Sequence, residues 1–173
     1  MKTIILVRHA KSSWDDPEWD DFERPLNKRG KMDAPFMAEL ISSKLEQPDI
    51  FLSSPAQRAL TTALEYAKAF GINENSISLD KKIYELGKRY ILDKIKNLDE
   101  DFDSVILFGH NPDITSLSTY FSGEFFDNVP TCGTLCVDID VASWKEIEDR
   151  NGSIRFYEIP KKYPKKERQQ YLK

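Results

Sequence analysis

The stretch Thr3-Ile-Ile-Leu-Val-Arg-His-Ala10 decides the fold. Its first five residues form a short apolar run bounded by charge, which is typical of a buried strand in an α/β sheet. Residues at the carboxyl end of such a strand face the crevice in which open α/β sheets bind ligands. Arg8 and His9 stand at that end, where a fixed fork of donors suits phosphate and an imidazole can act as a nucleophile. By itself, this pair is equally typical of a capped strand end with two polar surface residues.

The chain has only two histidines, and the second also follows a strand run. Residues 104–108 (Ser-Val-Ile-Leu-Phe) are followed by Gly-His-Asn-Pro at 109–112. A third run, residues 49–53, is followed by Ser-Pro-Ala-Gln-Arg at 54–58, and helical spacing of apolar residues predicts a helix over 56–70. Pro55 suits the first turn of that helix, because its missing N–H costs nothing there.

Arg58 falls in the first turn of the same predicted helix. The helix macrodipole disfavours a cation at this position, and an anion bound beside the guanidinium would compensate. We therefore expect three strand ends to bring two arginines and two histidines to one crevice, namely Arg8, His9, Arg58 and His110.

Five motifs, in order along the chain, resemble the histidine phosphatase superfamily. They are Leu-Val-Arg-His-Ala-Lys-Ser at 6–12, Arg-Pro-Leu at 24–26, Ser-Ser-Pro-Ala-Gln-Arg at 53–58, Tyr-Glu at 84–85 and Gly-His-Asn-Pro at 109–112. The short chain and the Arg-His-Ala-Lys-Ser wording resemble the small branch of SixA-like phosphohistidine phosphatases. This resemblance covers about residues 2–140 and implies a phosphoglycerate mutase-like fold.

The resemblance also implies roles for individual residues. His9 would be the nucleophile, forming a covalent phosphohistidine that water then hydrolyses. Arg8, Arg58 and His110 would clamp the phosphoryl oxygens, so that neither a metal nor another cofactor is needed. Glu85 matches the proton donor of many members, but SixA-like members differ around this loop, and a phosphoramidate leaving group needs less help from an acid.

Asn111 and Ser12 are candidates for further substrate contacts at the phosphate. Turn or cap chemistry explains both side chains equally well.

The roles implied for the two histidines require opposite protonation states. Nucleophilic His9 must be neutral, and neighbouring cations disfavour its protonated form, so we expect its pKa to lie below that of a free histidine. His110 would be more useful charged and stabilised by bound phosphate. Activity is therefore expected to fall on both sides of a pH optimum.

The substrate is less constrained than the chemistry. The stretch from Glu85 to Ser104 holds one short predicted helix and leaves little room for a lid. Because an open pocket suits a phosphorylated side chain on a protein, we expect phosphohistidine on a protein as the substrate. A small phosphoester is the alternative, and a mutase ranks third because it must keep its phosphorylated intermediate away from water. A non-catalytic phospholigand-binding module is a further alternative, although binding alone would not require the nucleophile.

Composition predicts an ordinary globular enzyme. The 173 residues are 40% hydrophobic and 31% charged, with a net charge of -4, which suits a single domain over 1–160. A basic tail, 161–173, carries six positive charges against one negative, and no nucleic-acid module accompanies it. We expect a cytoplasmic protein with neither membrane nor nucleic acid as partner, because no apolar run approaches the ~18 residues of a membrane helix and the apolar N-terminus is too short for a signal peptide.

The predicted architecture is a three-layer α/β/α sandwich. Strands near 3–7, 49–53, 104–108, 134–140 and 153–159 form a mainly parallel sheet with an antiparallel edge, and helices near 28–45, 56–70, 88–97 and 113–121 cover both faces. Asn27 is a possible N-cap, and Pro35 predicts a kink or a later helix start. Asn151-Gly152 indicates the turn of a final hairpin. Cys132 and Cys136 are interpreted as small core residues rather than a zinc site or a disulfide.

Residues 15–23 carry six acidic groups without a base, interleaved with tryptophan and phenylalanine. We favour a solvated loop whose aromatic side chains cover the domain edge. In the alternative, the loop overhangs the crevice, repels small polyanions and suits a phosphorylated protein surface that carries basic residues.

Overall fold

The computed structural model describes residues 1–172 and contains one six-stranded sheet in the order β3-β2-β4-β1-β5-β6. The strands are Lys2–Arg8 (β1), Ile50–Ser53 (β2), Ile77–Leu79 (β3), Ser104–Gly109 (β4), Thr134–Ile139 (β5) and Gly152–Glu158 (β6). The first four strands run parallel to one another, whereas β5 pairs antiparallel with β1 and β6 pairs antiparallel with β5. The prediction of a mainly parallel sheet with an antiparallel edge is confirmed.

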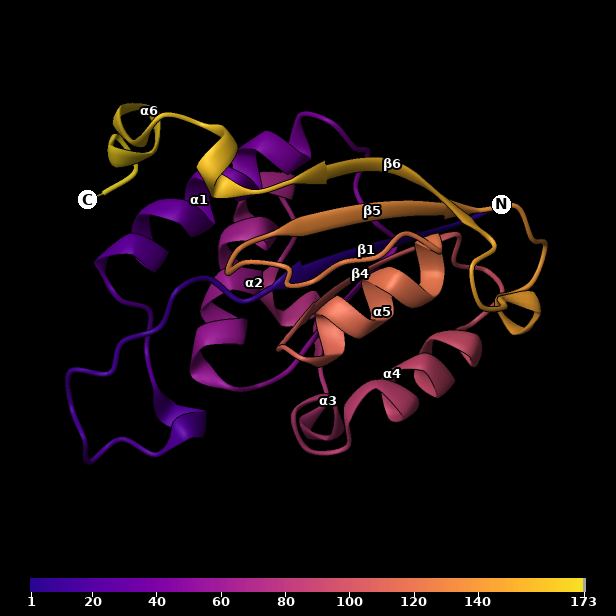
Figure 1. Ribbon diagram of the computed structural model, residues 1–173, viewed down its shortest axis with the longest axis horizontal. Coiled ribbons are helices and arrows are strands. Elements are labelled where there is room, and N and C mark those ends of the chain that lie inside the picture. The colour runs from indigo at the N-terminus through magenta and orange to yellow at the C-terminus, as the bar shows by residue number, and fades with distance from the viewer. Residues whose placement is uncertain (173) are drawn as a thin grey trace.

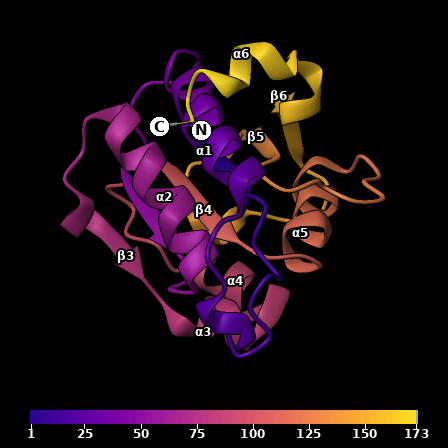
Figure 2. The same ribbon diagram turned by 90° about the vertical axis from the view of Figure 1, so that its left-hand side faces the viewer.

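Helices cover both faces of this sheet (Figures 1 and 2). They are Lys28–Ser42 (α1), Gln57–Phe70 (α2), Lys81–Glu85 (α3), Gly87–Lys96 (α4), Asp113–Ser122 (α5) and Lys165–Gln169 (α6), with one-turn 3₁₀ helices at Asp21–Glu23, Glu74–Ser76, Trp144–Glu146 and Pro160–Lys162. One hydrophobic cluster packs α1 and α2 against the sheet, and a second packs α3, α4 and α5 against the other face. The predicted three-layer α/β/α architecture is therefore also confirmed.

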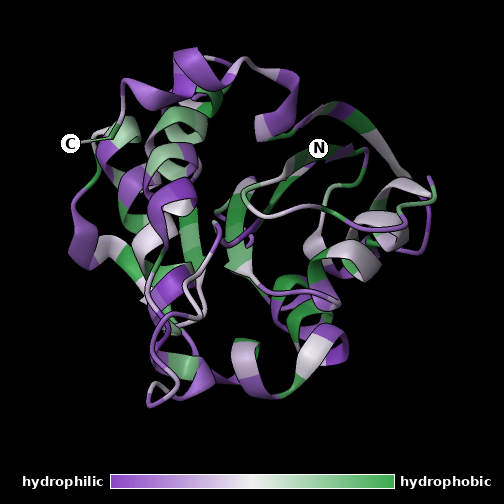
Figure 3. Cartoon of the chain, turned by 60° about the vertical axis from the view of Figure 1, so that its left-hand side comes forward, coloured by the Kyte–Doolittle hydropathy of each residue, from purple (hydrophilic) through white to green (hydrophobic). Residues whose placement is uncertain are grey.

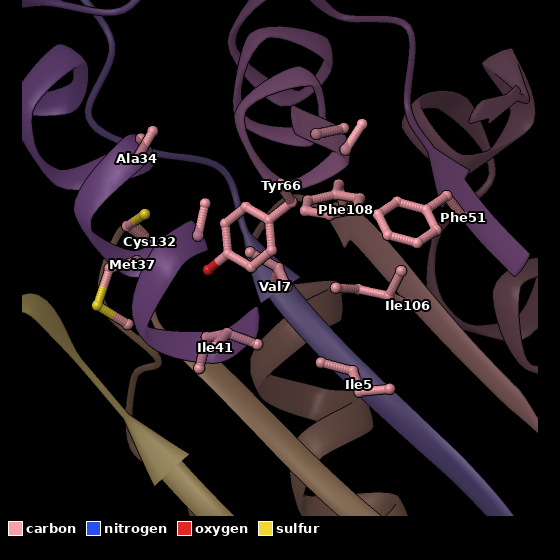
Figure 4. Packing of buried hydrophobic residues seen from close by; sticks show 14 of the residues in the cluster. Ile5, Val7, Ala34, Met37, Ile41, Phe51, Tyr66, Ile106, Phe108 and Cys132 are labelled. Carbon is pink, nitrogen blue, oxygen red and sulfur yellow. The ribbon is translucent and has the colours of Figure 1, made fainter. Parts of the chain in front are cut away.

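The apolar run that opens the chain is explained by this layering. Successive side chains of a strand point to opposite faces, so Ile5 and Val7 join the α1–α2 cluster while Ile4 and Leu6 join the other cluster. Because both faces are covered, every one of these positions must be apolar, and all four are at most 1% exposed. Figure 4 shows Ile5 and Val7 on β1 among the buried residues of the α1–α2 cluster, and Figure 3 shows the same hydrophobic character in the central strands.

The start of α1 fixes the segment that follows His9. The Asn27 side chain accepts a hydrogen bond from the backbone N–H of Gly30, as expected of an N-cap, and the Asn27 backbone N–H donates to the Lys11 carbonyl at 2.9 Å. A Cβ atom on Gly30 would lie 2.2 Å from the same Lys11 oxygen. Only glycine therefore lets α1 pack this closely against the backbone beyond His9.

The predicted end of one helix and the predicted first turn of another are wrong in detail. Helix α1 begins directly after Asn27, runs through Pro35 and ends at Ser42 rather than near 45. The helix tolerates Pro35 because packing of the face that includes Met37 outweighs one lost backbone hydrogen bond. Helix α2 begins at Gln57 with Ala56 as its N-cap, so Pro55 lies just before the helix.

The expected tight turn at Asn151-Gly152 is wrong. The connection from β5 to β6 spans residues 140–151, and Gly152 is already the first residue of β6. The longer connection buries Trp144, whose Nε1–H donates to the Phe102 carbonyl at 2.9 Å. A Cβ on Gly152 would lie 2.4 Å from Val137 Cγ1, so this glycine serves close packing instead of turn geometry.

Both cysteines are free and buried, as the core interpretation predicted, and Cys132 lies beside Met37 in Figure 4. The described part of the basic tail lies against α1, where Arg168 pairs with Asp33 and the Tyr171 hydroxyl donates to Glu39 at 2.5 Å. Lys173, the last residue of that predicted tail, lies outside the described residues. Within residues 1–172, no helix has the length and apolar character needed to cross a membrane.

Candidate active site

Three adjacent strands end at the same edge of the sheet, and the predicted residues follow them. His9 comes after β1 and His110 after β4, and the His9 backbone N–H donates to the Gly109 carbonyl at 3.0 Å. The centroids of the two imidazole rings are 5.2 Å apart. Ser54, which follows β2, lies 2.8 Å from His110 Nε2 through its hydroxyl oxygen. The parallel order β2-β4-β1 therefore gathers the three strand ends into one crevice.

His9 has the tautomer and protonation state of a nucleophile. Its Nδ1 lies 2.7 Å from the Ala10 carbonyl oxygen, and because a carbonyl only accepts, Nδ1 carries the proton and Nε2 keeps a free lone pair. Burial lowers the pKa of His9 to about 3, with further lowering from His110, Arg58 and Arg8. The predicted direction is confirmed, although burial outweighs the neighbouring cations that we expected to dominate. His9 is therefore neutral at neutral pH.

His110 differs from the expectation of a charged group. Burial, followed by the charge of Arg58, lowers the pKa of His110 to about 3, and the opposing effect of Asp21 is smaller. Its ring is therefore neutral in this structure. Its Nδ1 is buried and has no hydrogen-bond partner. A dianionic phosphoryl group beside the ring would raise this pKa again, because an opposite charge favours the protonated form.

Guanidinium groups complete the crevice. Arg8 donates from Nη1 to the Val129 carbonyl at 2.8 Å, and burial, followed by Arg29 and Arg58, lowers the pKa of the Arg8 guanidinium. In the described chain, the buried side-chain nitrogen and oxygen atoms without a partner are Arg8 Nε, Arg58 Nε and His110 Nδ1. Buried nitrogens of this kind are costly unless they are satisfied, and the two guanidinium N–H groups beside a nucleophile suit an anion.

Asp21 is part of the site, and the sequence assigned it no role. Its Oδ2 accepts hydrogen bonds from Arg58 Nη2 at 2.9 Å and from the Tyr84 hydroxyl at 2.8 Å, and its Oδ1 accepts from Arg24 Nη2 at 2.8 Å. Burial would raise the pKa of Asp21, but the hydrogen bonds from Tyr84, Arg24 and Arg58 together hold it well below its usual range. The carboxylate is therefore ionised at any working pH.

This position of Asp21 corrects the favoured interpretation of residues 15–23. The segment does not merely cover the domain edge, because Asp21 reaches into the crevice and contacts Arg58. Figure 2 shows the indigo segment that contains it beside α2 and α3. The sequence signalled the segment but not the residue, since the acidic run leads directly into the Arg-Pro-Leu motif at 24–26 and all six of its acidic residues share that position.

Ser12 and Asn111 use their side chains for structural contacts. The Ser12 hydroxyl accepts a hydrogen bond from Arg24 Nη1 at 2.6 Å. The Asn111 amide oxygen accepts from the backbone and hydroxyl of Thr115 at 3.2 and 2.9 Å, and its amide nitrogen donates to the Val129 carbonyl at 3.0 Å. The Asn111 contacts match the cap chemistry that the sequence analysis left open, whereas Ser12 holds the guanidinium group of Arg24 and forms no turn or cap within residues 1–172.

Within the part of the chain that the structure describes, Glu85 makes none of the contacts that join the other predicted residues. It ends α3, its side chain is 48% exposed, and it pairs with Lys81 at 3.5 Å. Its neighbour Tyr84 instead lies in the crevice, with its ring edge-on to His110 at a centroid separation of 5.3 Å. Across residues 1–172, Glu85 forms no hydrogen bond or ion pair with the two arginines or the two histidines.

The donor set of the crevice suits an anion better than a metal ion. Over residues 1–172, no three His, Cys, Asp or Glu side chains are grouped as metal ligands. The crevice instead gathers the guanidinium groups of Arg8, Arg24 and Arg58.

The comparisons with known proteins agree with this geometry. The family model of the histidine phosphatase superfamily (branch 1) matches residues 4–89. The chain belongs to the histidine phosphatase superfamily. Within it the chain is SixA-like and is a phosphatase: the solved structure of SixA from Agrobacterium tumefaciens is similar at a TM-score of 0.77 and 27% identity, over 92% of this chain and 98% of that one.

Two curated relatives extend the comparison. An uncharacterized chloroplastic protein of Arabidopsis thaliana is 29% identical over 153 residues, which cover 84% of this chain and 70% of the relative. Phosphoserine phosphatase 1 of Hydrogenobacter thermophilus is 38% identical over 78 residues, which cover 40% of this chain and 33% of the relative. The superfamily relationship therefore extends to proteins named for small phosphoester substrates.

Proposed function

We propose that this phosphatase removes phosphate from phosphohistidine on a protein, with His9 as covalent nucleophile and Arg8, Arg58 and His110 as the phosphoryl clamp. One observation carries the proposal. The three buried side-chain nitrogens without a hydrogen-bond partner in the described chain belong to these three clamp residues, and His9 beside them presents a free Nε2 lone pair. A phosphoryl group would satisfy the donors while its phosphorus faces the nucleophile.

The reaction proceeds in two displacements. In the first, His9 Nε2 forms a bond to phosphorus as the bond from phosphorus to the substrate imidazole breaks. The substrate ring leaves as neutral imidazole, because its other nitrogen carries a proton beforehand. In the second, water attacks the phosphorus on His9, the N–P bond electrons return to Nε2, and inorganic phosphate leaves after losing one proton to solvent.

The scarcity of acids in the site supports phosphohistidine over a phosphoester. An alkoxide leaving group needs a positioned proton donor, whereas a protonated phosphoimidazole does not. Asp21 is ionised, both histidines are neutral in the free site, and Glu85 pairs with Lys81. The similarity to SixA from Agrobacterium tumefaciens over nearly the whole chain supports the same substrate class.

A small phosphoester is the second candidate. The similarity to phosphoserine phosphatase 1 favours it. The Tyr84 hydroxyl, whose ring lies edge-on to His110, would then be a proton donor in the crevice, but burial and the hydrogen bond to Asp21 raise the pKa of Tyr84 and make it a weak acid.

Phosphate release tests the proposal directly. Wild type and His9→Asn are assayed in chelator against a phosphohistidine protein, phosphoserine and p-nitrophenyl phosphate. Release from phosphohistidine that His9→Asn abolishes supports the proposal. Release from the esters alone would show that the substrate is a small phosphoester and not phosphohistidine. Tight phosphate binding without release from any substrate would indicate a non-catalytic binding module.

A further inference from the structure

Residues 15–23, here named the acidic rim, are fixed beside the catalytic crevice by contacts at one end. Asp21 joins Arg58 and Arg24, and the Phe22 ring lies edge-on to Tyr84 with centroids 5.2 Å apart. The Arg24 guanidinium in turn lies 3.6 Å from the centre of the Trp14 ring, just before the rim. These contacts bring the rim to the mouth of the crevice and not to a remote edge of the domain.

The rest of the rim presents uncompensated negative charge. Five of its acidic side chains form no ion pair within residues 1–172, namely Asp15, Asp16, Glu18, Asp20 and Glu23. Arg24, the nearest base in sequence, is 7% exposed and already paired with Asp21. Trp14 and Trp19 are exposed among these carboxylates, at 71% and 36%. Such a surface repels small polyanions and attracts cationic groups.

A groove of about 470 Å³ lies between the rim and the start of α2. Its lining residues are Trp19, Phe22, Glu23, Pro25, Pro55 and Gln57. The groove is next to the crevice, because Gln57 precedes Arg58 and Phe22 follows Asp21. Aromatic and proline walls suit the aliphatic stem of a lysine or arginine, and a carboxylate at the edge suits its charged head.

We propose that the acidic rim and this groove form a docking surface for lysine and arginine side chains next to the phosphorylated residue of a protein substrate. This inference rests on the proposed function and defines its substrate class more narrowly. The phosphoryl group enters the cationic crevice while flanking cations meet the carboxylates of the rim. The opposite charges of the two neighbouring surfaces therefore select a phosphorylated residue in a basic segment over a free phosphorylated metabolite.

The test compares phosphohistidine peptides whose flanking residues are lysine with peptides whose flanks are glutamate. Wild type is expected to show a kcat/KM about tenfold higher for the lysine-flanked peptide at low salt, with the preference shrinking as salt is added. The double variant Glu18→Gln/Glu23→Gln should lose most of this preference through KM and keep its turnover of p-nitrophenyl phosphate. Neither side chain forms a hydrogen bond within residues 1–172, so the variant leaves the loop contacts in place. Glu74→Gln, an exposed position in another 3₁₀ helix, is the matched control and should behave as wild type.

Three results would overturn the docking surface. They are equal kcat/KM for the two flanks in wild type, a parallel loss on peptides and small ester in the double variant, and self-association of wild type that the double variant abolishes. The last would assign the rim to a second copy of the chain.

Failure of the proposed function gives a different pattern. If wild type hydrolyses neither phosphohistidine peptide, the same flanks are compared around phosphoserine. A preference for lysine flanks around phosphoserine would support the docking surface and reject only phosphohistidine as the substrate residue. Equal rates for the two flanks would reject both the docking surface and the phosphohistidine substrate.

Discussion

Replacing the two histidines should make the protein less sensitive to acid. The pKa of both His9 and His110 is about 3 in the folded chain, against about 6.5 for an unfolded histidine. Because the unfolded chain binds protons that the folded chain does not, stability is complete above about pH 6.5 and falls as the pH drops toward the folded pKa. Between about pH 7 and pH 5, each histidine should cost about 2 kcal/mol of unfolding free energy, and the pair about 4 kcal/mol.

Urea denaturation at the two pH values measures this effect. The chain has only two histidines, so His9→Asn/His110→Asn removes all histidine titration. Comparing the pH-dependent change in each protein cancels any constant effect of the substitutions. Wild type should lose about 4 kcal/mol more than the double variant, and each single variant should lie midway. Equal losses in all four proteins would show that the histidines titrate normally in the fold, and would refute the buried, neutral state on which His9 nucleophilicity rests.

Four further substitutions test other parts of the site. Asp21→Asn should lower the inhibition constant of inorganic phosphate about fivefold, because a partly exposed carboxylate no longer competes for Arg58; an unchanged or higher constant would contradict this. Arg58→Lys keeps the charge but loses the fork, and should lower kcat/KM about 100-fold on every substrate in steady-state assays. Gly30→Ala should lower the unfolding free energy by about 2 kcal/mol in urea, since its Cβ would meet the Lys11 carbonyl; wild-type stability would refute the close packing. Glu85→Gln should change phosphohistidine turnover less than about twofold, and a loss near 100-fold would make Glu85 the proton donor.

The strongest local signals in the sequence predicted the core of the fold well. The run at residues 4–7 is apolar throughout because both faces of β1 are covered, and that pattern is visible without coordinates. Short or edge elements were missed, since Ile77–Leu79 has only three residues and only Ile77 is buried. The Asn-Gly pair at 151–152 was misread because Gly152 is required by contacts with Val137, which lies far away in sequence. Tertiary contacts of this kind leave no local pattern.

The sequence was sufficient to predict those residues of the candidate site that directly follow a strand. Topology places His9 and His110 together once both are assigned to strand ends, and the ring separation of 5.2 Å agrees. The role of Asp21 was not predictable, because six acidic residues within nine positions are equivalent in sequence and only the fold places one against Arg58. Glu85 was selected by motif position, and the helix that carries it pairs it with Lys81.

The central claim is that phosphate passes through His9. A phosphohistidine protein labelled with radioactive phosphate is mixed with wild type in chelator, quenched in alkali within one turnover and mapped by mass spectrometry. The account predicts an acid-labile, alkali-stable phosphoryl group on the peptide that contains His9, absent in His9→Asn. Full phosphate release without a labelled His9 peptide, or release that His9→Asn retains, would contradict it.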